Sequence, residues 1–168
     1  MTEDGFHVTH WAGLRLEQPH VMGILNVTPD SFSDGGKFDH IDTALAQAQL
    51  MVTQGASIID VGGESTRPGA AEVSVSEEIE RVRPVIEALD AQGVLVSIDT
   101  RKPAVMQAAA AAGAGLINDV TGLTDDPQSM AVALDLNLPV CVMHMQGEPK
   151  TMQAAPSYTD APAEVFEF

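Results

Sequence analysis

The sequence predicts an α/β fold of the eight-stranded (β/α) barrel type, and three observations support this prediction. Short apolar runs typical of buried strands alternate five times with segments of helical spacing, as in parallel βαβ units. Each run ends in polar residues, and the carboxyl ends of the strands form the active face of a barrel. An open doubly wound sheet also binds ligands at that edge, but no Gly-x-Gly-x-x-Gly follows the first run. The barrel is therefore the favoured fold class.

Apolar runs and their flanking turn residues locate the expected strands. They lie at residues 21–26, 57–61, 94–98, 115–117 and 138–143. Residues 6–18 are expected to form a short hairpin before the first of them. A complete barrel takes about 250 residues. The 168 residues of this chain are therefore expected to be the N-terminal portion of a single domain, truncated after about five βα units.

Helical spacing and capping residues locate the expected helices. The first spans 41–54, and the second runs from a Ser76 cap to Gly93, with Pro84 expected to kink it or divide it from a preceding turn. The third spans the alanine-rich segment 102–112. A fourth opens at Asp126-Pro127, residues 147–162 are expected to be loop, and the last residues begin another helix. The apolar positions of the fourth helix include Met130, Ala133 and Leu134.

Composition excludes several classes of partner. With 24 acidic and 8 basic residues the chain carries a net charge of −16, which disfavours nucleic acid and anionic membranes. No apolar run approaches the roughly 20 residues of a membrane helix, and the acidic N-terminus lacks a signal-peptide pattern. A cytoplasmic protein is expected. Cys141 is the only cysteine, which rules out an internal disulfide, and its apolar neighbours predict a buried structural thiol.

The first strand leads into a loop that is rich in oxygen ligands. The run from Val21 ends at Asn26, and the next residues read Val-Thr-Pro-Asp-Ser-Phe-Ser-Asp-Gly-Gly. An amide, several hydroxyls and two carboxylates at the end of a buried strand suit a hard cation or a phosphate. The alternative is an ordinary polar loop after a strand.

Two segments together closely resemble the dihydropteroate synthase family. They are Asn-Val-Thr-Pro-Asp-Ser-Phe-Ser-Asp-Gly-Gly from Asn26 and Gly-Gly-Glu-Ser-Thr-Arg-Pro-Gly from Gly62, within a resemblance that spans roughly residues 20–150. The resemblance implies an enzyme of folate biosynthesis and target of sulfonamides, with one pterin-binding barrel domain. It would join p-aminobenzoate to 7,8-dihydropterin-6-ylmethyl diphosphate and release pyrophosphate.

The resemblance also assigns roles to residues of these two loops. Asn26 corresponds to the residue that binds the Mg²⁺ accompanying the diphosphate. Thr66 and Arg67 correspond to residues around the pyrophosphate, and a guanidinium can hold phosphate oxygens with two parallel hydrogen bonds. Phe32 and Pro68 match positions that line the aminobenzoate pocket.

Two later strand ends match the family's pterin-binding positions. These are Asp99, after Val96-Ser-Ile, and Asn118, after Leu116-Ile; a carboxylate beside an amide suits the donor and acceptor edge of a pterin. Met143 is implied to be an apolar wall of the same pocket. Asp119 is interpreted as a loop cap, and His144 as a partner in a structural hydrogen bond because it lacks a second ligand at metal spacing.

Other functions remain open at this point. A related pterin-binding methyltransferase barrel is one alternative, although methyl transfer has no pyrophosphate for the two loops to hold. A non-catalytic fragment that binds ligand weakly or serves as a partner surface is another. The family's later motifs (a D-P-G-type Asp, Ser-Arg-Lys and Arg-x-His) do not occur in these residues, so the 168-residue chain alone is expected to lack activity. The family resemblance implies a homodimer for the complete enzyme.

Overall fold

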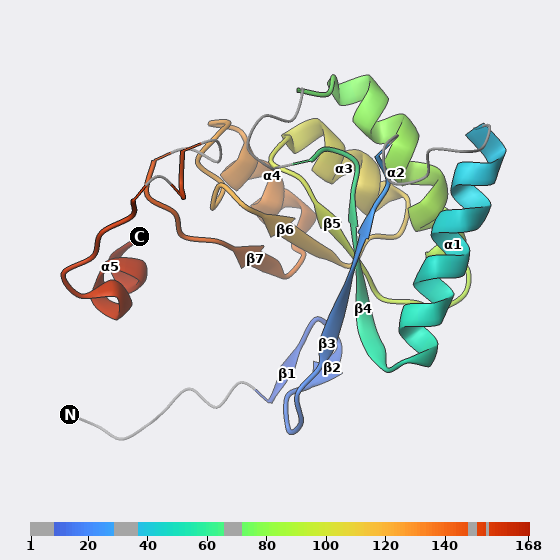
Figure 1. The fold of residues 1–168 in the computed structure, drawn as a ribbon, viewed down its shortest axis with the longest axis horizontal. Helices are drawn as coiled ribbons and strands as arrows, with labels where there is room; N and C mark the ends of the chain where they lie inside the picture. The colour runs from blue at the N-terminus through green and yellow to red at the C-terminus, as the bar shows by residue number, and fades with distance from the viewer. Residues whose placement is uncertain (1–8, 29–36, 66–71, 148–150, 154) are drawn as a thin grey trace.

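In the part of the chain that the structure describes, five parallel strands form one sheet in which each strand pairs with the next strand along the chain (Figure 1). The computed structural model describes residues 9–28, 37–65, 72–147, 151–153 and 155–168. A doubly wound sheet reverses its strand order at a switch point, whereas this sheet runs without reversal. The predicted barrel-type α/β fold is therefore confirmed. The strands are β3 (Val21–Asn26), β4 (Ala56–Gly62), β5 (Val96–Asp99), β6 (Leu116–Asp119) and β7 (Val140–Val142).

Four helices connect these strands and cover one face of the sheet. They are α1 (Lys37–Thr53), α2 (Val75–Asp90), α3 (Pro103–Ala111) and α4 (Ser129–Leu136). Along β4, Ile59 and Val61 belong to a hydrophobic core shared with the helices, while the alternating Ile58 and Asp60 do not. Because successive side chains of a strand point to opposite faces, the side chain of Asp60 lies on the face of the sheet that the helices do not cover. The helical members of the core are Ala44, Ala48, Val82, Val85, Ile86, Leu89, Val105, Met106, Ala109, Val132 and Ala133.

Both ends of the chain agree with the expectations. A two-stranded antiparallel hairpin of β1 (His10–Trp11) and β2 (Leu14–Arg15) precedes β3. The short helix α5 (Ala161–Glu167) follows the loop segment and lies apart from α1 to α4, beyond β7 (Figure 1). In the part of the chain that the structure describes, no helix is long and apolar enough to cross a membrane.

The second helix differs from the prediction at its cap, and it is not divided at its proline. Ser74, not Ser76, caps α2: its backbone is extended and its Oγ accepts a hydrogen bond from the N–H of Glu77 at 3.3 Å. Pro84 does not divide the helix, which is continuous over Val75–Asp90. Pro84 lacks an N–H to donate, but the apolar face on both sides of it is fully buried, and this packing carries the helix across the missing bond.

Three other expectations need correction. The fourth helix starts at Ser129 rather than at Asp126, and its Met130 and Leu134 are 53% and 71% exposed while Val132 and Ala133 are buried. The carboxylate of Asp126 instead accepts a hydrogen bond from the N–H of Gln128 at 2.8 Å, which forms a turn before the helix. Cys141 is only partly buried, because β7 has a neighbour on one side alone among the described strands.

We predict that residues 1–168 associate when they are produced alone. Ile24 on β3 is 63% exposed and Val142 on β7 is 52% exposed, and these strands are the two edges of the described sheet. Unpaired strand edges and exposed apolar side chains favour pairing with another chain. Light scattering should report oligomers, and Ile24→Lys should reduce their size more than Leu134→Lys on α4. A monodisperse monomer with cooperative unfolding would contradict this prediction.

Candidate functional site

The register of the sheet places the predicted strand-end residues at one level. Asn26 pairs with Gly62, Gly62 with Asp99, and Asp99 with Asn118. The residue before each of them is part of the core under the helices, so these four positions face the opposite side of the sheet. The preceding core residues are Leu25, Val61, Ile98 and Ile117. The row continues to Cys141 on β7. Three strands of the sheet thus bring one carboxylate and two amides to a common edge.

Gly62 keeps the middle of this row open. A Cβ placed on Gly62 would lie 3.4 Å from Oδ2 of Asp99 and 3.6 Å from Oδ1 of Asn26. These two oxygens therefore flank the space that a side chain at position 62 would take. An amide oxygen and a carboxylate oxygen around such a space can serve a hard cation or a ligand with donor groups.

A second acid lies one layer below this row. Asp60 is only 3% exposed and pairs in register with Ser97 of β5. Its Oδ2 accepts a hydrogen bond of 3.0 Å from Nδ2 of Asn118, across β5. Its Oδ1 is buried and has no hydrogen-bond partner among the described residues. Sequence analysis missed Asp60, although a charged residue inside the apolar run Ile58-Ile59-Asp60-Val61 was the available signal.

Burial raises the pKa values of both acids, and like charge adds to the rise at Asp99. Burial is the main cause of the rise in the pKa of Asp99 to about 7, and the charges of Asp60, Glu78, Asp119 and Glu64 add to it. Burial also raises the pKa of Asp60, against hydrogen bonding from Ser97 and Asn118. The Ser97 hydroxyl is buried beside Asp60 but makes no hydrogen bond of normal geometry, whereas Nδ2 of Asn118 donates to Oδ2 of Asp60 at 3.0 Å.

A network of ion pairs surrounds the start of the second loop. Glu64 accepts hydrogen bonds from the N–H of Val73 at 3.0 Å and from Nε of Arg101 at 3.4 Å, and pairs with Nζ of Lys102 at 3.1 Å. Burial opposes ionisation of Glu64, but these bonds and the two positive charges outweigh it and lower its pKa. Glu64 thereby links Val73 to the turn after β5.

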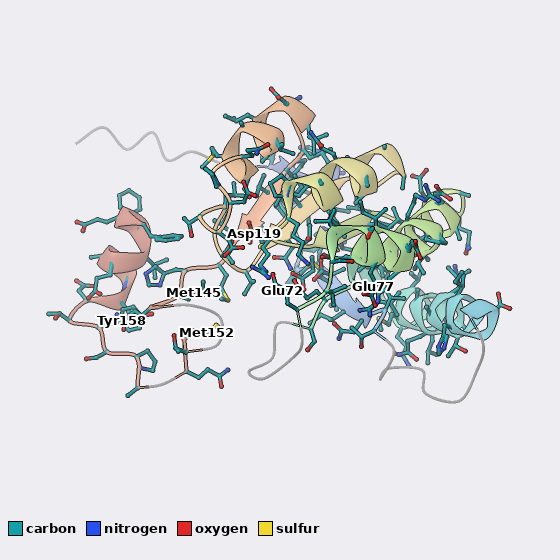
Figure 2. All side chains as sticks on the ribbon, turned by 90° about the horizontal axis from the view of Figure 1, so that it is seen from above. Glu72, Glu77, Asp119, Met145, Met152 and Tyr158 are labelled. Carbon is teal, nitrogen blue, oxygen red and sulfur yellow. The ribbon has the colours of Figure 1, made fainter. Side chains whose placement is uncertain are left out.

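The same two cations reach further acids. Arg101 pairs with Asp125 at 2.6 Å and with Glu72 at 3.4 Å, and Lys102 pairs with the fully buried Glu78 at 2.7 Å. Thr100 also donates its hydroxyl to Glu78 at 2.7 Å. The acidic side chains of Glu72 and Glu77, labelled in Figure 2, flank the start of α2. Sequence analysis did not identify this network, although Arg101 and Lys102 directly follow the predicted strand end.

The interpretations of Asp119 and His144 are confirmed. The carboxylate of Asp119, labelled in Figure 2, accepts bonds from the N–H groups of Thr121 and Leu123 and from the hydroxyl of Thr121. It therefore holds the turn after β6. His144 Nδ1 lies 3.4 Å from the Tyr158 hydroxyl, a contact that links the end of β7 to the C-terminal segment.

The remaining predicted site residues are less defined. Met143 is half-buried just after β7. Phe32, Thr66, Arg67 and Pro68 lie outside the described residues. Across residues 9–28, 37–65, 72–147, 151–153 and 155–168 there is no group of three or more His, Cys, Asp or Glu side chains that could hold a metal.

The pKa of Asp99 predicts a pH dependence of stability. The unfolded chain releases this proton near its ordinary pKa of 3.8, whereas the folded chain holds it to about 7. The folded state binds more protons in this interval, so the free energy of unfolding should fall as the pH rises from about 4 to about 7. Urea unfolding should show a smaller fall for Asp99→Asn, while the exposed control Asp135→Asn keeps the parent slope. Equal slopes for all three proteins would contradict this account.

Comparison with known proteins identifies relatives over nearly the whole chain. The model of the family described as pterin binding enzyme matches residues 22–168. The dihydropteroate synthase of Escherichia coli is 58% identical over 156 residues, which cover 92% of this chain and 55% of that protein. The chain thus spans about half the length of the curated relatives that it matches.

Solved structures agree in fold. The structure of the Yersinia pestis dihydropteroate synthase with a sulfonamide drug complex superposes with a TM-score of 0.82 at 55% identity, over 93% of this chain and 57% of that one. The Xanthomonas albilineans dihydropteroate synthase with 4-aminobenzoic acid gives a TM-score of 0.81 at 52% identity, over 94% and 56%. On the family match over residues 22–168 and on the sequence and structural similarity to these relatives, this chain belongs to the pterin-binding enzyme family.

Proposed function

We propose that this chain forms the first five βα units of a dihydropteroate synthase. Such an enzyme joins p-aminobenzoate to 7,8-dihydropterin-6-ylmethyl diphosphate and releases pyrophosphate. The observation that carries the proposal is the row of Asn26, Asp99 and Asn118 at the carboxyl edge of the sheet, directly before the first loop. Relatives that match most of the chain bear this name, and one solved relative contains 4-aminobenzoic acid.

Asp99 and Asn118 are proposed to bind the pterin. They occupy adjacent strands at one level, so a flat ring can meet both side chains at once. The carboxylate accepts hydrogen bonds from ring or amino N–H groups, and the amide both donates and accepts. Met143 is proposed to supply an apolar wall. Both polar residues are at least partly buried. A ligand group that cannot hydrogen-bond to them would therefore give up its hydrogen bond to water and gain none in the site.

Asn26 is proposed to hold the diphosphate end of the substrate through Mg²⁺. Its exposed side chain ends β3 and its Oδ1 borders the space above Gly62, so an oxygen ligand is available at the start of the first loop. Bound Mg²⁺ would neutralise charge that accumulates on the departing pyrophosphate. Thr66 and Arg67 are proposed to hold the phosphate oxygens, and Phe32 and Pro68 to line the aminobenzoate pocket.

The reaction needs no protein nucleophile in this proposal. The residues of this chain bind and orient the two substrates so that the arylamine meets the pterin methylene as the carbon–oxygen bond to pyrophosphate breaks. The proposal includes a homodimer, as the family resemblance implies, and the cytoplasmic location expected from the sequence. A methyltransferase barrel is not favoured, because relatives that are 51–58% identical over 92% of this chain are dihydropteroate synthases.

The proposal is tested by assaying dihydropteroate formation with Mg²⁺, using the protein that carries this chain at its full encoded length. Turnover is expected from that protein and not from residues 1–168 alone. Binding of the pterin diphosphate should be measured in parallel by calorimetry. Binding without turnover in the full-length protein would favour the non-catalytic alternative.

Asn26→Ala should separate the diphosphate end of the site from the pterin end. We expect kcat/KM to fall at least about tenfold, because a metal on a phosphoryl oxygen is worth several kcal/mol, and binding of the bare pterin to change little. Gln47→Ala on the exposed side of α1 serves as the control. An equal loss of affinity for both ligands would remove Asn26 from this role.

Asp99→Asn should weaken pterin binding while it keeps the shape of the side chain. The exchange places an amide donor where the ligand needs an acceptor, and a buried mispaired polar group costs about 1–3 kcal/mol. Affinity for the bare pterin should therefore fall roughly tens-fold. Calorimetry on the variant measures the effect, and unchanged affinity would refute the assignment of Asp99 to the pterin pocket.

A further inference from the structure

Asp60 lies on the same face of the sheet as Asn118 and within hydrogen-bonding distance of its side-chain amide. Ile59 and Val61 beside it belong to the helix-covered core, so the carboxylate of Asp60 lies on the same face of the sheet as Asn118 and Asp99. Its register partner on β5 is Ser97, two residues before Asp99. The carboxylate therefore lies one layer below the row that contains Asn118.

The contact between the two residues crosses a whole strand. Asp60 belongs to β4 and Asn118 to β6, and β5 separates these strands. Nδ2 of Asn118 nevertheless donates to Oδ2 of Asp60 at 3.0 Å. Among the described residues, this is the hydrogen bond that the structure gives to the Asn118 side chain. The acceptor is buried, since Asp60 is only 3% exposed.

The chemistry of the pair selects one orientation of the amide. A carboxylate accepts hydrogen bonds and cannot donate them, so it pairs with the NH₂ group of Asn118 and not with its carbonyl oxygen. Reversal of the amide would set Oδ1 of Asn118 against Oδ2 of Asp60, two acceptors in a buried place. Asn118 then presents its Oδ1 and its second N–H to the ligand.

We infer that Asp60 is a positioning residue that fixes the amide of Asn118 so that the site reads a 2-amino group beside an unprotonated ring nitrogen. This inference rests on the proposed pterin site. A 2-amino-4-oxopteridine offers an amino donor next to a ring acceptor, which matches the carbonyl and N–H of Asn118 in this orientation. A 2,4-dioxopteridine offers the reverse order, a ring N–H donor next to a carbonyl acceptor, and fits only the reversed amide.

The buried state of Asp60 supports this role. Its Oδ1 has no hydrogen-bond partner among the residues that the structure describes, so the bond to Asn118 is its principal polar contact there. Burying an acid with so few hydrogen-bond partners lowers the stability of the folded chain, so stability alone does not account for Asp60. Burial raises the pKa of Asp60, and the bond from Asn118 opposes that rise, which means that the same bond favours the charged form that orients the amide.

The test compares two ligands on the parent protein and on Asp60→Asn, at full encoded length. The variant keeps size and shape, but an amide at position 60 can accept from Asn118 or donate to it, so both orientations become available. The parent should prefer the 2-amino-4-oxopteridine to the 2,4-dioxopteridine by roughly tens-fold, and the variant should lose about tenfold of this preference. Calorimetry at one pH measures both affinities.

A matched control separates orientation from general damage. Ser97→Ala changes the other polar neighbour of Asp60 in the same layer and should keep the parent preference. A merely structural role for Asp60 would weaken both ligands by one factor in Asp60→Asn, and an unchanged ratio of the two affinities overturns the inference. If the parent binds neither pteridine, the proposed pterin site fails first, and the orientation is decided by the measurement below.

Nuclear magnetic resonance tests the orientation in the parent protein, without a change at Asp60. The side-chain amide signals of Asn118 can be assigned from their loss in Asn118→Asp. One amide proton should exchange slowly with solvent before any ligand is added, because it is bonded to buried Asp60, and the other should exchange fast. Rapid exchange of both protons would show that Asp60 does not hold the amide.

Discussion

Parallel pairing in a fixed register is the constraint on which the candidate site depends. Successive side chains of a strand alternate between faces, so a shift of one residue in any strand would turn its polar end residue into the helix-covered core. The apolar positions Ile59, Val61, Ile98 and Ile117 prevent this shift because each is fully buried against the helices. Each such burial is worth about 1.5–3 kcal/mol. The core that holds the helices thus also keeps Asp99 and Asn118 at one level.

The charges around the site divide into two groups with opposite behaviour. Glu64 and Glu78 face Arg101 and Lys102 at hydrogen-bonding distance, and these acids hold the loops at the carboxyl edge. Removing one partner of a buried pair costs about 3–5 kcal/mol. Asp99 and Asp60 have no cation among their described contacts, and burial raises the pKa of each. The structural acids are therefore neutralised within the chain, whereas Asp99 in the row retains capacity to accept hydrogen bonds from a ligand.

Much of this arrangement was predictable from sequence because strand ends are easy to recognise. Apolar runs that stop at Asn26, Asp99 and Asn118 located three members of the row, and the structure aligns them. The cap of α2 was predictable in principle, since Ser74 and not Ser76 has a Glu three residues later, the pattern of a capping box.

Other features depend on tertiary contacts that sequence patterns do not contain. The bond between Asp60 and Asn118 joins residues 58 positions apart across an intervening strand. The exposure of Met130 and Leu134 reflects which side of α4 meets α3. The ion pairs of Arg101 depend on where three separate loops meet. The roles of Phe32, Thr66, Arg67 and Pro68 lie outside the described residues and stay predictions.

The consecutive order of the strands has a consequence for synthesis. Every described strand from β4 onward pairs with the strand that precedes it in the chain. Domains fold from the N-terminus as the chain emerges at about 5–20 residues per second, and none of the described strands from β4 onward must wait for a later strand before it can find a partner. The sheet can therefore grow one βα unit at a time on the ribosome, with β3 as its template. Its growing edge is then the surface that a chaperone would have to protect.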